Sequence, residues 1–321
     1  NTSNVTNLDQ TWGYCRQLKS FPTIDTSKVT NMSYTWLYCN GLTTFPLLDP
    51  SLVTNLNLTW MGCSSLASFP AIDTSRCTYF VQAWYGCSSL TSFPQIDTSR
   101  GTGFDYTWSG CTSLASFPLL DFSKAISLYQ TWGYCFNLTS FPSINPRLVQ
   151  NLSYAWLNCS RLSTFPGEIF ANCIYNGIQA QGTWSGCPLT QASVDSILKG
   201  FDDSGTTGGF LDVTNSASPP SRTAIATSAA NLFSKGWSLM WNAPIYNCST
   251  NVNPAGEISL YKAWYYCSNI TSFPLLDVSS CKVFSFAWYS CSNMTSFAAL
   301  NTGSGVSFVQ TWTYCSKLTS F

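Results

Sequence analysis

A tryptophan recurs at a fixed interval along most of the chain, and this interval constrains the fold more than any other feature. The interval is 24 residues through the first seven occurrences, and the pattern resumes near the end of the 321-residue chain. A fixed period of roughly 20–50 residues is the signature of repeat architectures, in which each unit packs mainly against its neighbours. The repeated tryptophans are Trp12, Trp36, Trp60, Trp84, Trp108, Trp132, Trp156, Trp184, Trp264, Trp288 and Trp312.

Other residue types keep a nearly constant distance from each tryptophan. Cys follows three residues later, Leu six, Phe nine, Ile or Leu twelve, and Asp or Asn thirteen. Around the second tryptophan these are Cys39, Leu42, Phe45, Leu48 and Asp49. Stacked copies of one unit place equivalent positions above one another, so we expect buried ladders of Trp, Cys, Leu, Phe and Ile or Leu.

The spacing of the apolar residues predicts two short elements in each unit. Apolar positions seven and four residues before the tryptophan, at it, and three after it follow the helical period, which predicts a short helical arm. The Leu-Thr-Ser-Phe segment after the Cys suits a short strand, which the following Pro ends. The sequence therefore predicts an α/β repeat solenoid whose 24-residue coils each carry one short parallel strand and one short helical arm. In the continuous parallel sheet that follows, we expect these residues to stack: Leu18, Leu42, Leu66, Leu90, Leu114 and Leu138.

The composition excludes several classes of function. Charged residues make up 9% of the chain against the roughly 25% usual in soluble domains, while 45% of the residues are hydrophobic. Lys plus Arg and Asp plus Glu both total 14, so no net charge attracts nucleic acid or anionic lipid. Histidine is absent and the only glutamates are Glu168 and Glu257, which removes Ser-His and Cys-His nucleophile pairs and His metal ligands. No apolar run approaches the roughly 18 residues of a membrane span.

The 24-residue period is interrupted after the eighth tryptophan. We predict three domains: solenoid repeats over 1–184, a helix-strand-helix-strand insertion stacked on the solenoid over 185–263, and further solenoid repeats over 264–321. Because the chain starts without a Met and begins and ends within repeats, we expect a processed chain or a fragment. The elements expected in the insertion are a helix over 189–201 capped by Thr190, a strand over 208–213, a second helix from Pro219 through Leu232 stopped by Gly236, and a strand over 237–241.

The turn before the helical arm has a characteristic sequence. It reads Asp-Thr-Ser-Lys-Val-Thr-Asn over 25–31 and, more loosely, Asp-Thr-Ser-Arg-Cys over 73–77. Together with the Cys-x-x-Leu-x-x-(Leu/Phe) segment, this turn resembles that of the BspA-like leucine-rich-repeat surface proteins. The Thr-Trp-x-x-Cys and Ser-Phe-Pro motifs are similar to repeats of phage tail-fibre and adhesin-like proteins, and the segment from 187 to 237 resembles one that accompanies such repeats. The resemblance implies a leucine-rich-repeat-like fold and brings no catalytic motif.

Fifteen cysteines raise the question of disulfides or zinc. Eleven of them follow a repeated tryptophan by three residues, and Cys77 and Cys281 occupy a position that Val fills in other coils. Stacked side chains point in parallel rather than toward one another, so we interpret these cysteines as reduced, buried packing residues. Cys173 and Cys248, beside the insertion, are the two that could form a disulfide, and the sequence leaves open whether they pair. No Cys-x-x-Cys pair indicates zinc.

Two polar columns could carry chemistry. An Asp column could indicate calcium or a glycosidase carboxylate pair, but a Lys or Arg three residues later in four coils, and the Asp-Thr-Ser turn itself, favour a capping role. Ser and Thr form a double column, as at Thr43 and Thr44 or at Thr271 and Ser272, which could bind glycans or ice, or merely suit a tight strand surface. The Asp column consists of Asp25, Asp49, Asp73, Asp97 and Asp121.

Tyrosines beside the tryptophans form the candidate binding face. Their positions vary between coils, with Gly62, Gly86, Gly110 or Ser290 in place of tyrosine elsewhere. Large amphipathic rings that vary on a constant frame are typical of a binding surface, although tyrosines that only pack on their neighbours would look the same. The candidate residues are Tyr34, Tyr38, Tyr85, Tyr106, Tyr134, Tyr154, Tyr265, Tyr266 and Tyr314.

These observations favour a non-enzymatic surface protein without a catalytic, cofactor-binding or metal site. The expected function is adhesion or receptor binding by a viral tail fibre or spike, or by a bacterial surface adhesin, on the virion or the extracellular surface. The expected partners are a host-surface glycan or protein, other copies of the chain, or other virion proteins. The alternatives are a structural assembly protein of a virion or extracellular filament and, with no acid–base pair in evidence, a polysaccharide depolymerase.

Overall fold

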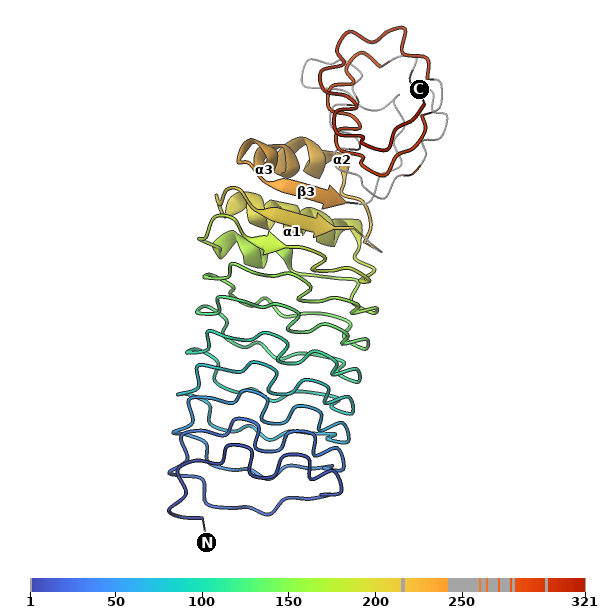
Figure 1. Cartoon of the computed structure of the whole chain (residues 1–321). Helices are drawn as coiled ribbons and strands as arrows, with labels where there is room; N and C mark the ends of the chain where they lie inside the picture. The colour runs from blue at the N-terminus through green and yellow to red at the C-terminus, as the bar shows by residue number, and fades with distance from the viewer. Residues whose placement is uncertain are drawn as a thin grey trace.

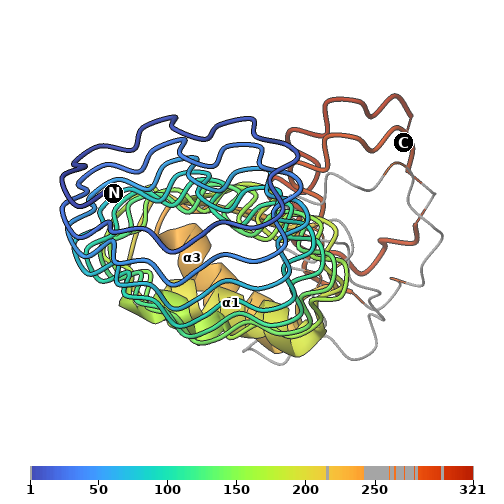
Figure 2. The same ribbon diagram turned by 90° about the horizontal axis from the view of Figure 1, so that it is seen from below.

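In the computed structural model, successive 24-residue repeats stack on one another from residue 2 to residue 178 (Figure 1). Viewed from below, each repeat is a flattened loop (Figure 2). The structure describes residues 2–214, 217–241, 260, 264, 271, 278, 281–297 and 300–320.

One segment of each repeat makes most of the backbone contacts with the next repeat. This bridge segment runs from five residues before each repeated tryptophan to two residues after it, as in 31–38. Its alternate N–H groups donate to carbonyls of the following repeat, for example from Trp36 N to Thr59 O at 2.9 Å and from Tyr38 N to Met61 O at 2.7 Å. A single parallel bridge joins each segment to the next. The bridged residues are Asn7, Asn31, Asn55, Tyr79, Gly103, Ser127, Asn151 and Gln179.

The bridge segment is a series of turns rather than the short helix that the apolar spacing predicts. The residues two before and two after each tryptophan from Trp12 to Trp184 have a left-handed backbone, as at Tyr34 (φ 58°) and Tyr38 (φ 54°). A left-handed residue interrupts an α-helix and costs roughly 1–2 kcal/mol when it is not glycine. The N–H groups between the bridging ones bond three residues back, as from Leu37 N to Tyr34 O. Apolar periodicity alone does not distinguish this geometry from a helix.

The segment predicted to be a strand is extended chain that carries few bonds between repeats. This return segment runs from the Leu six residues after the tryptophan to the Asp thirteen after it, as in 42–49. Within it Thr43 N donates to Lys19 O at 3.1 Å, whereas Leu42 N bonds locally to Cys39 O. Pro46 has no N–H to give. Between residues 2 and 178 no bridge forms here, so the backbone pairing lies on the bridge segments instead.

The core consists of aromatic ladders. The indole rings from Trp12 to Trp184 stack with centroids 5.2–5.9 Å apart and planes within 12° of parallel. Phe rings meet them edge-on, as Phe117 meets Trp108 at 4.8 Å. The indole N–H groups from Trp36 to Trp184 have no hydrogen-bond acceptor. Each unpaired N–H costs about 1–3 kcal/mol, which is less than the about 5 kcal/mol that burying some 200 Å² of ring contributes.

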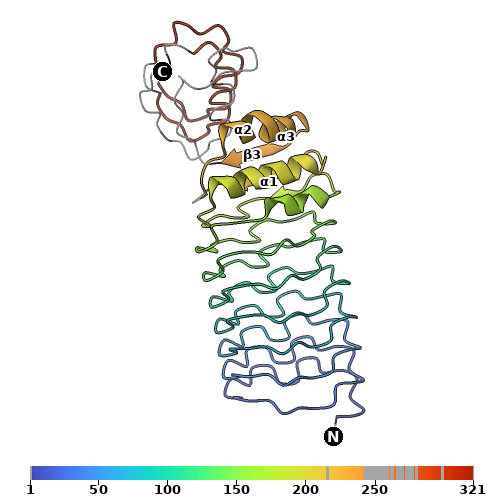
Figure 3. The same cartoon turned by 180° about the vertical axis from the view of Figure 1, so that it is seen from behind.

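Two longer repeats continue the stack with regular elements. Strands β1 (Gln179–Ala180), β2 (Phe210–Val213) and β3 (Ser238–Trp241) form a parallel sheet in that order. Since Asn151 bridges to Gln179, this sheet extends the column of bridges. The helices lie on the opposite face from the strands (Figures 1 and 3). They are η1 (Gly167–Asn172), α1 (Gln191–Asp203), α2 (Arg222–Ala224), which continues through the π-helix η2 (Ile225–Ala229), and α3 (Ala230–Ser234).

These elements follow the order expected for the insertion. The helix predicted over 189–201 is α1, and its first turn is capped because Thr190 Oγ1 accepts a hydrogen bond from Ser193 N. The strands predicted over 208–213 and 237–241 are β2 and β3. The second helix contains a π-helical turn that its apolar spacing does not reveal, and it ends before Gly236 (φ 79°).

Two glycines allow α1 to dock against η1. Gly200 of α1 lies against Gly167 of η1, and a Cβ at residue 200 would stand 2.1 Å from the Gly167 carbonyl oxygen. A Cβ at residue 167 would in turn stand 2.1 Å from Ile197 N. Only residues without a side chain permit this backbone approach.

Candidate functional site

Seven of the nine candidate tyrosines lie on the outward side of the bridge segments, and Tyr265 and Tyr266 lie outside the described residues. The structure does not bring all seven together. Tyr38 pairs with Tyr14, and Tyr314 pairs with Tyr289 in a separate part of the chain. Tyr34, Tyr38, Tyr85, Tyr106 and Tyr154 are half-buried, whereas Tyr134 and Tyr314 are 37% and 66% exposed.

Backbone conformation accounts for part of the variation between tyrosine and glycine. The position two residues after the tryptophan is left-handed whether it holds Tyr38, Gly62 or Gly86. Glycine adopts this conformation without the cost that tyrosine carries. The glycines at this position therefore need no ligand to explain them, and variation alone does not identify a binding face.

Four tyrosines do form one continuous feature, which we call the tyrosine chain: Tyr85, Tyr106, Tyr129 and Tyr154. Successive ring centroids are 6.3, 5.2 and 5.8 Å apart, and each pair meets edge to face. Such pairs contribute about 0.5–1.5 kcal/mol each beyond the area that they bury. The tyrosine chain crosses four repeats, so its rings are held in place by the fold.

Tyr129 is a member that the sequence analysis missed. It lies three residues before Trp132, whereas Tyr106 and Tyr154 lie two residues before their tryptophans. In the bridge segment the residue before it, Leu128, is buried, while Tyr129 and the next residue are half-buried and outward. Its contact with Tyr106 depends on how adjacent repeats stack, which the sequence does not show.

The surroundings of the tyrosine chain carry almost no charge. Burial, followed by the hydrogen bond and the proximity of Tyr129, raises the pKa of Tyr106 to about 12. Around these rings, the bridge segments 79–86, 103–110, 127–134 and 151–158 contain one charged residue, Asp105. Its Oδ1 accepts a hydrogen bond from Tyr129 N at 3.2 Å. The face therefore presents rings, hydroxyls and amides with almost no charge.

The Asp column stabilises turns. Ser27 N donates to Asp25 Oδ1 at 3.0 Å, and Thr26 Oγ1 donates to Asp49 O of the next repeat at 2.7 Å. Hydrogen bonds from Ser27 and Ser75 lower the pKa values of Asp25 and Asp73 respectively. The charges of Lys28 and Arg76, three residues on, add to this lowering, although the ion pairs within the described part of the chain are Lys199–Asp203 and Lys235–Asp202. A shallow pocket of about 440 Å³ lies between the first turns of the column.

The ladder thiols act as hydrogen-bond donors inside the core. Cys39 Sγ lies 3.2 Å from Trp12 O of the preceding repeat, and the same contact recurs through Cys187. Burial raises the pKa of Cys111 to about 12. Cys173 is a free, buried thiol, and Cys248 lies outside the described residues. Cys281 is disulfide-bonded, so its interpretation as a reduced packing residue is wrong.

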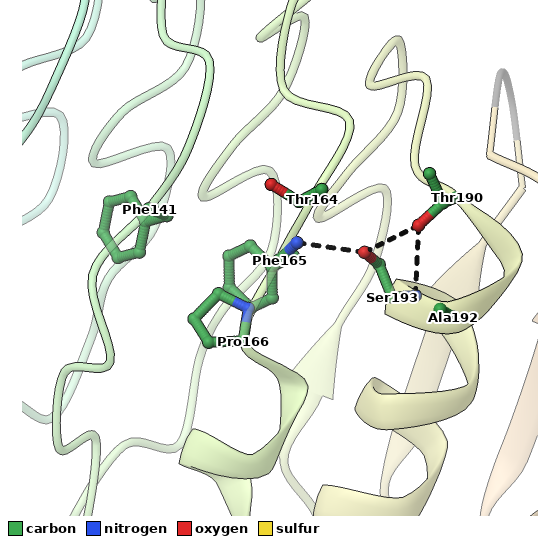
Figure 4. Close-up of a pocket in the computed structure, with 7 residues that line it drawn as sticks. All are labelled: Phe141, Thr164, Phe165, Pro166, Thr190, Ala192 and Ser193. Atoms are coloured by element: carbon green, nitrogen blue, oxygen red, sulfur yellow. Dashed lines mark hydrogen bonds between the residues drawn. The ribbon is translucent and has the colours of Figure 1, made fainter.

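Two further features are the Ser and Thr columns and a pocket beside α1. The paired Ser and Thr of the return segments, such as Thr43 and Thr44, are exposed, whereas Ser272 lies outside the described residues. A pocket of about 370 Å³ beside the start of α1 is lined by Phe141, Pro166 and uncharged neighbours (Figure 4). Its Ser193 hydroxyl already accepts from Phe165 N at 3.0 Å, and no charged residue lines this pocket.

Comparisons with protein-family models, with curated proteins and with solved structures find no match to this chain. Among the described residues no three or more Cys, Asp or Glu side chains are grouped so as to hold a metal ion. None of the described helices has the length and apolar character required to cross a bilayer. The tyrosine chain is therefore the candidate functional site.

Proposed function

We propose that this chain is a non-enzymatic, leucine-rich-repeat-like solenoid of a virion or extracellular surface that acts in adhesion or receptor binding. The observation that carries the proposal is the tyrosine chain: four aromatic rings held in a fixed geometry on the outside of a stack of repeats. A rigid aromatic surface loses little conformational entropy when a partner binds. Its partner is a host-surface glycan or protein.

An enzymatic role has little support from the side chains available. The two glutamates are 89 residues apart in the sequence, and the aspartates of the turns accept local hydrogen bonds that lower the pKa values of Asp25 and Asp73. A general acid needs a raised pKa, which is the opposite of what these turns produce. Binding without chemistry is the simpler assignment.

A cell-attachment assay tests the proposal. The purified chain, labelled on lysine, is incubated with candidate host cells, and bound label is measured with and without an excess of unlabelled chain. Saturable attachment supports adhesion. Self-association without attachment to any cell would instead favour the structural assembly protein, which light scattering of the same sample detects.

A further inference from the structure

We infer that the tyrosine chain is a binding site for a neutral, linear glycan that runs along the stack of repeats. This inference rests on the proposed adhesive function and names the class of its ligand. A pyranose ring has an apolar face of C–H groups and a polar rim of hydroxyls. The tyrosine chain offers the complement of both, namely aromatic rings for the faces and phenol oxygens for the rims.

The direction of the site follows from its geometry. The rings at Tyr85, Tyr106, Tyr129 and Tyr154 come from four successive repeats and are separated by 5.2–6.3 Å. The spacing is close to the length of one hexose unit, so a linear glycan laid along the stack passes each ring in turn. Because successive rings are turned by 65–82°, the glycan meets them alternately by face and by edge. A ligand of this shape gains affinity as it lengthens until it spans the four repeats.

The electrostatics exclude a charged ligand. The four bridge segments carry no Lys or Arg to pair with a sulfate, carboxylate or phosphate, and their one charge is the Asp105 carboxylate. A cationic partner would find a single carboxylate that already accepts a hydrogen bond from Tyr129 N. Charge complementarity therefore points to an uncharged partner, whose binding is nearly independent of salt.

Amide and hydroxyl groups beside the rings suit the rim of a sugar. Gln130 is half-buried, and its Nε2 makes one long contact, at 3.5 Å, with the buried Ser109 Oγ, so this amide keeps hydrogen-bonding capacity for a ligand. The combination of stacking rings with amides and hydroxyls distinguishes a sugar from a purely apolar peptide.

The test uses the intact chain on an array of linear oligosaccharides. Neutral, sulfated and sialylated members of matched length are compared at low and high salt. We expect binding to neutral members, with an affinity that rises with length and is unchanged by salt. Tyr106→Ala and Tyr129→Ala should each weaken binding about tenfold, as expected for a lost stacking contact of about 1.4 kcal/mol. Tyr14→Ala is the matched control, since this tyrosine is 58% exposed but lies outside the tyrosine chain.

The outcomes separate the ligand class from the adhesive function. A preference for charged glycans, or binding that salt abolishes, overturns the inference. Attachment to cells that survives periodate oxidation of their glycans but not protease treatment also overturns it, while the proposed function stands. Failure to attach to any cell overturns the proposed function itself. If a melting curve shows that the Tyr106→Ala variant is unfolded, the Tyr85→Ala variant replaces it, because Tyr85 lies at the end of the tyrosine chain.

Discussion

The 24-residue repeats and the two longer repeats that follow them share one face and differ on the other. In both, a column of parallel pairs runs up the bridge side, from Asn7 to Asn151 and on through β1, β2 and β3. On the opposite side the short repeats close with an extended return segment, whereas the long ones close with helices. The paired residues are 24 apart in the first region but 31 and 28 apart in the second.

The difference teaches that the bridge side defines the stack and that the return side is exchangeable. The extra residues of the long repeats are accommodated by helices that dock on neighbouring repeats, as Gly200 of α1 does on Gly167. The pairing itself becomes more regular, because β2 and β3 pair over four residues without left-handed positions inside them. The four predictions below use this contrast.

The largest effect should come from alkaline pH. Burial raises the pKa of Cys39 to about 11, and those of Cys77 and Cys111 to about 12, from an ordinary value of 9.0. Above pH 9, the ordinary pKa, these thiols ionise in the unfolded chain, whereas in the folded state they stay protonated up to their raised pKa values. Their stabilisation is complete below pH 9 and is lost as the pH rises toward 12, at about 1.4 kcal/mol per pH unit for each thiol.

Residues 191–241 contain no cysteine, so the helices should outlast the tryptophan stack in this titration. Near-ultraviolet circular dichroism follows the stacked indoles, and far-ultraviolet dichroism follows α1. Cys77→Val is the control, because Val occupies the same slot in other repeats, and it should make the loss shallower. A tryptophan signal that persists to pH 12 would contradict the account of the thiols.

The next effect is that of Trp108→Ala. This side chain is fully buried between Trp84 and Trp132, and its loss should destabilise the neighbouring repeats by about 3–5 kcal/mol. Because repeats couple mainly to their neighbours, α1 and β2 should keep their protection from hydrogen exchange. Equal loss of protection in both regions would show that the whole stack unfolds as one unit.

Gly200→Ala addresses the long repeats. The new methyl group would meet the Gly167 carbonyl at 2.1 Å, so α1 must move away from η1 at a cost of about 1–3 kcal/mol. Thermal unfolding monitored by helix dichroism should shift, while the near-ultraviolet signal of the stack from Trp36 to Trp132 stays constant. Gly205→Ala separates the clash from a loss of backbone freedom, since no atom lies within 4 Å of its Cβ position although its φ is 73°.

The smallest effect is that of Thr107→Val. The buried Thr107 hydroxyl lies 2.6 Å from Phe104 O and 2.9 Å from Phe80 O of the preceding repeat. It therefore links two repeats by a hydrogen bond, whereas β2 and β3 are linked by strand pairing. Removing it should cost about 1 kcal/mol in a denaturant titration. The half-buried Thr102→Val serves as the comparison and should cost less. The Thr102 hydroxyl also donates to the preceding repeat, to Thr78 O at a longer 3.4 Å, so equal costs would show that burial does not strengthen the bond at residue 107.

Much of the core follows from the sequence alone. The constant spacing of Trp, Cys, Leu and Phe identifies residues such as Trp108, Cys111 and Leu114 that are fully buried, because equivalent positions of stacked units meet the same environment. Local chemistry also identifies α1, since Thr190 is an N-cap whose effect depends only on the residues next to it.

The tertiary structure alone decided which segment carries the pairing and where the candidate site lies. Backbone hydrogen bonds between repeats join residues 23 or more apart, so whether Trp36 N bonds within its own turn or to Thr59 O depends on how the neighbouring repeat is placed. The left-handed positions around each tryptophan are compatible with Tyr, Gln, Leu or Gly, and residue type does not reveal them. Tyr129 joins Tyr106 for the same reason: the two rings meet only when adjacent repeats stack in this register.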